Sequence, residues 1–253
     1  MPTALVTGAS SGIGLAFARK LAATGHDLVI VARSKDKLDE LADEVRVNVE
    51  VLPADLTDPA QVANVEARLT DASRPVDLLV NNAGSGTNGL FADTPIDVLD
   101  REVALDVIAP MRLTHAALPG MIARGSGGIL NVASIAAFQA GPLNAVYSAS
   151  KAFVLYLSEA VHEEARKSGV HVTVLCPGAT RTEFQQRGGF TAGKMPDFLW
   201  DQPETVVAHA LKALARNQAV CVPGVLNKIS TTTSHLAPRR VARKISAVVS
   251  SRI

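Results

Sequence analysis

The sequence predicts a doubly wound α/β fold, in which helices cover both faces of a parallel sheet. Two observations support this prediction. Short runs of leucine and β-branched residues alternate with longer segments whose apolar residues recur at helical spacing. The first of these runs leads directly into the glycine-rich stretch Thr7-Gly8-Ala-Ser-Ser-Gly12-Ile-Gly14 and then into a helical pattern.

The remaining elements follow the same alternation along the chain. Apolar positions such as Leu38, Leu41 and Val45 have the spacing of a helix, and the first helix is expected over Leu15–Thr24. The chain has no short internal repeat and no low-complexity linker, so residues 1–253 are expected to form one domain. The predicted strands are Ala4–Thr7, Asp27–Ala32, Val49–Pro53, Val76–Asn81, Gly128–Ala133, Val170–Cys176 and Ala219–Val222.

The composition is that of an ordinary globular protein, with 19% charged and 47% hydrophobic residues. The two cysteines, Cys176 and Cys221, exclude a disulfide framework and suit a reducing cytoplasm. We interpret Cys176 as strand-end packing. The N-terminus lacks the basic region of a signal peptide, and no apolar run is long enough to span a bilayer. The six histidines show no metal-ligand spacing, so no metal is expected.

Charge is unevenly distributed along the chain. From Thr205 onward there are eight Lys or Arg and no acidic residue, whereas residues 1–204 carry 17 basic and 24 acidic side chains. Within the basic tail, about residues 226–253, the segment Leu236–Val249 has the pattern of an amphipathic helix. Such a helix can lie on an anionic membrane, but packing on the protein or on a second subunit is favoured. No aromatic-interleaved basic motif indicates nucleic-acid binding.

The glycine-rich stretch is a candidate dinucleotide-binding turn. A tight passage from strand to helix needs positions without Cβ, here Gly8, Gly12 and Gly14, and a helix N-terminus offers free N–H groups to a phosphate. The spacing differs from that of the P-loop. A plain tight turn is the alternative, but the first-strand position favours a dinucleotide site. The residues between the glycines, Ser10, Ser11 and Ile13, belong to this predicted site.

Ligands of doubly wound sheets bind beyond the carboxyl ends of the strands. The second predicted strand ends at Arg33 with no carboxylate before Asp36, which favours the 2′-phosphate of NADP over the ribose hydroxyl of NAD. The third ends in Asp55-Leu56, where Asp55 either accepts from an adenine amino group or caps the helix that begins near Pro59. The fourth ends in Asn81-Asn82-Ala83-Gly84, small and polar residues at a point where the backbone must approach a ligand closely. The sixth continues into Pro177-Gly178-Ala-Thr180-Arg-Thr182.

Tyr147 and Lys151 are four residues apart and would share one face of a helix. A tyrosine that exchanges protons near pH 7 needs a pKa shift of about three units, and a nearby lysine cation can supply it. Ser134, at the end of the fifth strand, adds a hydroxyl that can hold a substrate oxygen. Taken alone, however, this spacing is also that of a common surface pair.

The ordered set of motifs resembles the short-chain dehydrogenase/reductase family over essentially the whole chain. The set comprises Thr7-Gly8-x-x-x-Gly12-x-Gly14, Asn81-Asn82-Ala83-Gly84, Ser134, Tyr147-x-x-x-Lys151 and Pro177-Gly178-x-x-x-Thr182. The resemblance implies a Rossmann fold with a seven-stranded parallel sheet and NAD(P)-dependent oxidoreduction of alcohols and carbonyls. It also implies a homodimer or homotetramer, formed partly through the helix that carries Tyr147.

The resemblance also implies roles for individual residues. Tyr147 would be the general acid, Lys151 would lower its pKa and bind the nicotinamide ribose, and Ser134 would hold the substrate oxygen. The three glycines would receive the pyrophosphate. Asp55 and Asn82 would line the adenosine side, and Thr182 and the backbone after Pro177 would meet the carboxamide.

One position departs from the family pattern. Asp106 stands where the family usually has an asparagine that helps to hold a water in the proton relay to the lysine. Its side chain adds a charge at this point of the relay, so the relay is in question while the Ser/Tyr/Lys set is not. We expect Asp106→Asn to be tolerated with a shifted pH profile.

Taken together, these patterns predict an NADPH-dependent reductase of a ketone or aldehyde. Residues 183–202 correspond to the family's variable substrate lid, and their four aromatic residues slightly favour a hydrophobic substrate. The alternative is a sensor or scaffold that binds NADP without turnover and uses the basic tail as an interaction surface. The complete Ser134, Tyr147 and Lys151 set argues against it, because sensing does not need an activated phenol.

Overall fold

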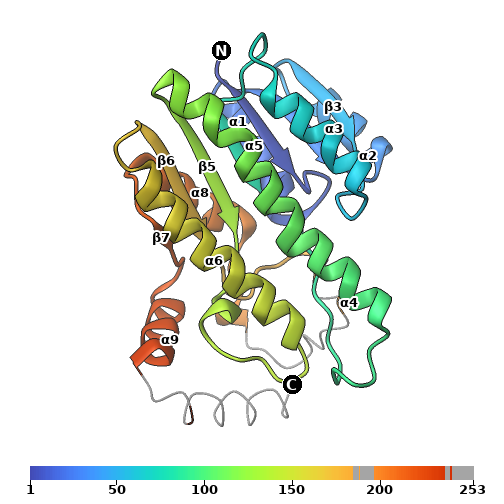
Figure 1. The fold of residues 1–253 in the computed structure, drawn as a ribbon, viewed down its shortest axis with the longest axis vertical. Coiled ribbons are helices and arrows are strands. Elements are labelled where there is room, and N and C mark those ends of the chain that lie inside the picture. The colour runs from blue at the N-terminus through green and yellow to red at the C-terminus, as the bar shows by residue number, and fades with distance from the viewer. Residues whose placement is uncertain (185–187, 189–196, 237–239, 241–253) are drawn as a thin grey trace.

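A seven-stranded parallel sheet forms the centre of the computed structural model, which describes residues 1–184, 188, 197–236 and 240 (Figure 1). The strand order is β3-β2-β1-β4-β5-β6-β7. The order therefore reverses between β1 and β4, which pair with each other, and this is where doubly wound sheets bind ligands. The strands are β1 Thr3–Thr7, β2 Asp27–Ala32, β3 Val49–Pro53, β4 Leu78–Asn81, β5 Gly127–Val132, β6 Val170–Leu175 and β7 Val220–Cys221.

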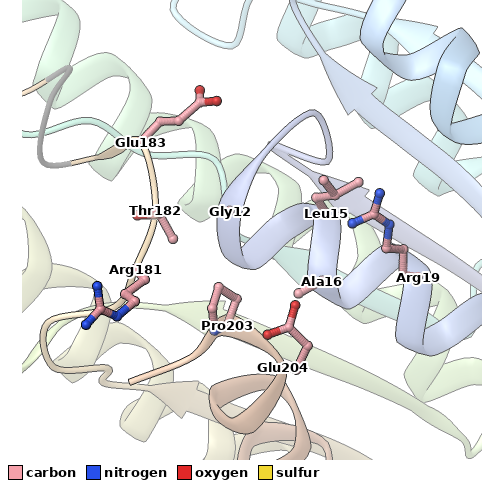
Figure 2. Close-up of a pocket in the computed structure, with 9 residues that line it drawn as sticks. All are labelled: Gly12, Leu15, Ala16, Arg19, Arg181, Thr182, Glu183, Pro203 and Glu204. Carbon is pink, nitrogen blue, oxygen red and sulfur yellow. The ribbon is translucent and has the colours of Figure 1, made fainter. Parts of the chain in front are cut away.

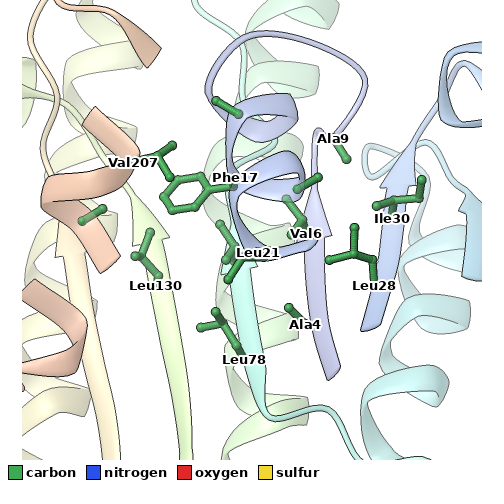
Figure 3. Close-up of a cluster of buried hydrophobic side chains, with 14 of the residues drawn as sticks. Ala4, Val6, Ala9, Phe17, Leu21, Leu28, Ile30, Leu78, Leu130 and Val207 are labelled. Atoms are coloured by element: carbon green, nitrogen blue, oxygen red, sulfur yellow. The ribbon is translucent and has the colours of Figure 1, made fainter. Parts of the chain in front are cut away.

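Helices cover both faces of the sheet. On one face α1, α2 and α8 share an apolar core with the strands, and Figure 3 shows Phe17 of α1 beside Val207 of α8 within it. On the other face α3, α5 and α6 build a second core around Val65, Leu113 and Val161. The helices are α1 Gly12–Ala23, α2 Lys35–Glu44, α3 Pro59–Thr70, α4 Ile96–Val103, η1 Ala104–Ile108, α5 Ala109–Arg124, η2 Ile135–Phe138, α6 Ala145–Ala165, η3 Asp197–Leu199, α8 Pro203–Ala215 and α9 Val225–Leu236.

Burial on both faces explains why the strands are continuous apolar runs without polar alternation. Ala4, Leu5 and Val6 of β1 are completely buried, with Val6 in one core and Leu5 in the other. The predicted fold class is confirmed. The limits of β2 and β3 are those predicted, and the limits of the other strands differ from the prediction by one or two residues. β4 begins at Leu78, because the preceding Asp77 exchanges hydrogen bonds with Thr3 through both its backbone and its carboxylate. The first helix begins at Gly12, three residues before the predicted start.

The long helical segment from α4 to α5 contains one turn of π-helix, η1. Such turns are rare and often occur at functional sites. Of the predicted lid, residues 183, 184, 188 and 197–202 are described. The predicted amphipathic segment Leu236–Val249 lies outside the described residues except at positions 236 and 240.

Candidate active site

The carboxyl ends of β1 and β4 are joined by hydrogen bonds. The Thr7 hydroxyl accepts from the backbone N–H groups of Asn82 at 2.9 Å and Ala83 at 3.0 Å. The Asn82 side chain in turn donates to the Thr7 carbonyl at 3.0 Å. The sequence placed Asn82 and Ala83 in a ligand site, and the structure places them directly beside the glycine turn, where their contacts fix its shape.

The glycine turn leaves no room for side chains. Gly8 and Gly12 have positive φ angles of 67° and 55°, a conformation that L side chains rarely adopt. A Cβ on Gly14 would lie 2.2 Å from the Gly8 carbonyl oxygen and 2.4 Å from Asn82 Nδ2. Ser11, the N-cap of α1, makes no side-chain capping bond, so the first N–H groups of α1 remain available to a phosphate. This cradle fits a dinucleotide pyrophosphate.

A cavity of about 390 Å³ lies on the outer side of this turn (Figure 2). Figure 2 shows that residues of α1, the segment after β6 and the start of α8 surround it. The described residues that line it do not include Ser134, Tyr147 or Lys151, so we do not assign it to the reacting groups. The lining residues are Gly12, Leu15, Ala16, Arg19, Arg181, Thr182, Glu183, Pro203 and Glu204.

Ser134, Tyr147 and Lys151 come together at the carboxyl edge of the sheet. Ser134 follows β5 as the N-cap of η2, and its hydroxyl accepts from the Ala136 N–H at 3.1 Å. Tyr147 lies in the first turn of α6 and hydrogen-bonds with Ser134. Lys151 Nζ lies 5.6 Å from the centre of the Tyr147 ring. The predicted neighbourhood of the three side chains is therefore present in the folded chain.

The environment of Tyr147 keeps its phenol protonated. Burial raises its pKa, and the charges of Asp106 and Glu102 act in the same direction. The Lys151 cation and the hydrogen bond with Ser134 lower the pKa, but they do not outweigh burial. Lys151 therefore acts with the expected sign, while the net shift is opposite to the expected lowering. A protonated phenol is the form that a general acid needs for carbonyl reduction.

Asp106 lies within η1 and pairs with Lys151. Only 1% of its surface is exposed, and its carboxylate accepts from the Ser85 N–H at 3.1 Å and from Lys151 Nζ at 3.4 Å. Burial raises the pKa of Asp106, and the Lys151 charge opposes this. Burial also lowers the pKa of Lys151, but attraction to Asp106 and Tyr147 outweighs it, so the net pKa is raised. The lysine is thus held as a cation.

Gly84 borders the Asp106–Lys151 pair. A Cβ at this position would lie 2.7 Å from Asp106 Oδ1 and 3.1 Å from Lys151 Nζ. The sequence suggested that a small residue is needed here for close approach of a ligand. The structure gives a second reason, because a side chain at Gly84 would push into the ion pair.

Asp55 does not cap the helix that follows β3. Its carboxylate accepts from the N–H and the hydroxyl of Thr57, at 3.0 and 2.8 Å, and so closes a local turn. The N-cap of α3 is Asp58, which accepts from the Ala60 N–H at 2.9 Å. The capping alternative is therefore wrong, whereas the adenine contact stays a prediction. Leu56 is buried beneath this turn, and Arg33 is exposed directly after β2.

The segment after β6 is fixed by three other parts of the chain. Pro177 accepts from the Ile135 N–H at 3.0 Å, next to Ser134. Thr180 forms a parallel bridge with Asp201 and donates to the Gly178 carbonyl. A Cβ on Gly178 would lie 2.5 Å from the Asn227 side chain of α9. The Thr182 hydroxyl accepts from the Phe184 N–H at 3.3 Å.

Sequence reasoning missed Glu102, which is buried one turn before Asp106, is repelled by the Asp106 charge, and raises the pKa values of Lys151 and Tyr147. The signal that could have identified it is its spacing of four residues from Asp106 on the same helical segment.

Comparison with known proteins identifies the family. Residues 2–189 match the short chain dehydrogenase family. The ketoacyl reductase HetN of Nostoc is 36% identical over 179 residues, which are 70% of this chain and 62% of that protein. The human very-long-chain 3-oxoacyl-CoA reductase is 32% identical over 83% of this chain and 68% of its own length.

Solved structures agree with this result. A short-chain dehydrogenase from Sphingobium yanoikuyae in complex with NADPH is 40% identical, with a TM-score of 0.83 over 89% of this chain and 88% of that chain. The bulky-bulky ketone specific alcohol dehydrogenase from Comamonas testosteroni is 34% identical, with a TM-score of 0.79 over 93% of each chain. The chain belongs to the short-chain dehydrogenase family, and it is an NAD(P)-dependent oxidoreductase of carbonyl or alcohol groups. These relatives do not favour the sensor alternative.

Among the helices of the described residues, none combines the length and the apolar character that a membrane span requires.

Proposed function

We propose that the protein is an NADPH-dependent reductase of hydrophobic ketones or aldehydes, with Tyr147 as the general acid. The observation that carries this proposal is the contact of the half-buried Tyr147 with the buried Ser134 and Lys151, beside a glycine turn that fits a pyrophosphate. HetN is named a ketoacyl reductase and the Comamonas protein is described as specific for bulky ketones, which supports a carbonyl substrate.

The bound nicotinamide would supply the hydride that reduces the carbonyl carbon. Ser134 and Tyr147 would hold the carbonyl oxygen, and the Tyr147 phenol would donate its proton to that oxygen as the hydride arrives. The products are the alcohol and a Tyr147 phenolate, which the Lys151 cation stabilises. Asp106 would keep Lys151 protonated and in place.

The residues of the glycine turn would hold the pyrophosphate, and Arg33 would meet the 2′-phosphate of the adenosine ribose. Support for NADPH comes from the end of β2, which carries Arg33 and no acidic side chain, and from the Sphingobium protein, which was solved with NADPH. The double change Ala32→Asp with Arg33→Ala should move the preference toward NADH. An unchanged ratio of NADPH to NADH activity would remove Arg33 from the site.

An aromatic side chain beside Tyr147 and exposed apolar side chains before and at the start of α4 support a hydrophobic substrate. The Phe184 ring lies 5.6 Å from the Tyr147 ring at an angle of 45°, so an aromatic face borders the phenol. Leu90 and Phe91, between β4 and α4, and Ile96, the first residue of α4, are exposed at 60%, 64% and 68%. A bulky apolar ketone would cover such surface, whereas a small polar one would leave it in water.

Two further parts of the proposal concern assembly and location. We place the subunit interface of a homodimer or homotetramer on α6, whose Phe153 is an exposed large apolar side chain. We place the protein in the cytoplasm, because Cys176 and Cys221 are both free and buried.

The test is a panel of ketones and aldehydes of increasing apolar size, each assayed by NADPH oxidation. Tyr147→Phe should lose turnover and still bind NADPH. Tyr156→Phe is the matched control, because it removes the hydroxyl of an exposed tyrosine on the same helix. Wild-type turnover by Tyr147→Phe would overturn the assignment of the acid.

A further inference from the structure

Glu102, near the end of α4, is a buried acidic residue that the mechanism above does not use. It is 2% exposed, and within the described residues neither carboxylate oxygen has a hydrogen-bond partner. Thr87 lies close enough to lower the pKa of Glu102, yet its contact falls outside hydrogen-bond geometry. Buried carboxylates without partners are rare because desolvation is costly, so this residue calls for a functional reason.

A small cavity adjoins the Glu102 carboxylate. Its volume of about 10 Å³ is close to the room that one water molecule needs. It is enclosed by the segment between β4 and α4, by the helix α4 and by the first turn of α6. One of its lining residues, Val146, directly precedes Tyr147. The lining residues are Thr87, Gly89, Phe91, Thr94, Leu99, Glu102, Leu143, Ala145 and Val146.

Glu102 is electrostatically coupled to the reacting groups. Burial raises its pKa, repulsion from Asp106 adds to this rise, and the Lys151 cation opposes it. Glu102 in turn raises the pKa values of Tyr147 and Lys151. The titratable groups that face it are thus Asp106 on η1 and Tyr147 and Lys151 on α6. Two buried carboxyl groups, Glu102 and Asp106, therefore interact with the same cation, Lys151. Groups that interact in this way titrate together, so that protonation of one changes the proton affinity of the other.

We propose that Glu102 is the outer member of a proton relay that reloads Tyr147 between turnovers. This inference rests on the proposed reductase function, since each reduction removes one proton from the phenol. A solvent proton would pass through a water in the small cavity to Glu102, then across one helical turn to Asp106, from Asp106 to Lys151, and from Lys151 to the Tyr147 phenolate. Each group in the relay regains its proton from the preceding group on the solvent side, so all four side chains return to their starting protonation states at the end of each cycle.

The geometry supports this direction of transfer. Asp106 and Lys151 are in contact at 3.4 Å, which links the inner members. Asp106 is buried with 1% exposure and does not line the water-sized cavity, whereas Glu102 does. Glu102 would thus connect the inner pair to solvent. It would be a positioning residue for protons and would not touch the substrate.

The relay makes a specific kinetic prediction for Glu102→Gln. Tyr147 holds its proton at the start, so the first turnover in a stopped-flow experiment should keep its wild-type rate. Steady-state kcat should fall at least tenfold with KM unchanged, and the deficit should grow as the pH rises and protons become scarce. Asp100→Asn, an exposed acid on the same helix, is the control and should behave as wild type.

A second measurement does not depend on turnover. The chain has two tyrosines, so in a Tyr156→Phe background the ultraviolet titration of phenolate reports Tyr147 alone. Adding Glu102→Gln should lower the pKa of Tyr147, because Glu102 raises it. If Glu102→Gln does not fold, Glu102→Asp tests the same point: it keeps the charge and should give a smaller steady-state deficit with the first turnover intact.

Two results would overturn the relay. Equal slowing of the first and later turnovers would indicate a structural role, and a rise in KM without a change in the pH profile would indicate a substrate contact. If no carbonyl compound is reduced at all, the proposed function fails, and the phenol titration still decides separately whether Glu102 acts on Tyr147.

Discussion

Gly84→Ala would separate the Asp106–Lys151 pair with one methyl group. The new Cβ would lie 2.7 Å from Asp106 Oδ1, whereas ordinary contact begins at 3.4 Å, so the oxygen must move by about 0.7 Å. The 3.4 Å distance to Lys151 Nζ would then grow to about 4.1 Å. At an effective dielectric constant of about 20, this weakens the attraction by roughly 1 kcal/mol, a factor of about five.

The expected result is a kcat for carbonyl reduction about fivefold below wild type, with NADPH affinity retained. Steady-state assays and an NADPH binding titration measure the two quantities separately. Gly120→Ala, an exposed helical position whose Cβ would meet only the end of the Arg124 side chain, is the control. Wild-type kcat with weakened NADPH binding would refute this reasoning and would show that Gly84 is needed for the ligand alone.

Three further substitutions test other parts of the account. Asp106→Asn should keep its first turnover and lose steady-state reduction at a lower pH than the wild type, because the inner carboxyl of the relay is removed and Asp106 raises the pKa values of both Tyr147 and Lys151; complete inactivity would contradict this. Gly14→Ala should weaken NADPH binding at least a hundredfold, measured by fluorescence titration, because its Cβ would overlap the Gly8 carbonyl; unchanged affinity would place the pyrophosphate elsewhere. Glu102→Gln should stabilise the fold by about 1 to 3 kcal/mol near neutral pH. Burial raises the folded-state pKa of Glu102 above its ordinary value of 4.5, so the wild-type protein loses stability as the pH rises from 4.5 through the folded-state pKa. Thermal melting should therefore show a stability difference between Glu102→Gln and the wild type that widens as the pH rises. A difference that narrows as the pH rises would contradict the burial argument.

The elements that the sequence predicted are those with a local cause. The glycine turn is fixed by backbone requirements at Gly8, Gly12 and Gly14, and each strand is a run that both faces bury. The meeting of Ser134 with Tyr147 was also accessible, because parallel strands and their following helices all deliver residues to one edge of the sheet.

Features set by long-range packing were not accessible. The π-turn at η1 determines where Asp106 points, and the pattern of residues around it is that of an ordinary helix. Burial of Glu102 depends on the packing of α4 against α6 and the segment before α4. Asp58 caps α3 in place of Asp55, because the Asp55 carboxylate is hydrogen-bonded to Thr57.

The pKa of Tyr147 shows the same limit in electrostatic terms. The spacing to Lys151 correctly indicated one favourable charge. The net direction, however, depends on how deeply the phenol is buried and on two carboxylates from another helical segment. The four-residue spacing of Tyr147 and Lys151 predicts neither the burial of the phenol nor the position of the two carboxylates.

The central claim is that Tyr147 protonates a carbonyl oxygen while hydride arrives from NADPH. The most direct test uses NADPH that carries deuterium at both hydrogen positions of nicotinamide C4 and a bulky apolar ketone. The wild-type protein and Tyr156→Phe should place deuterium on the carbinol carbon, and Tyr147→Phe should do so at least a hundredfold more slowly while binding NADPH equally well. Label in the product at an equal rate from Tyr147→Phe, or product without label from the wild type, would contradict the account.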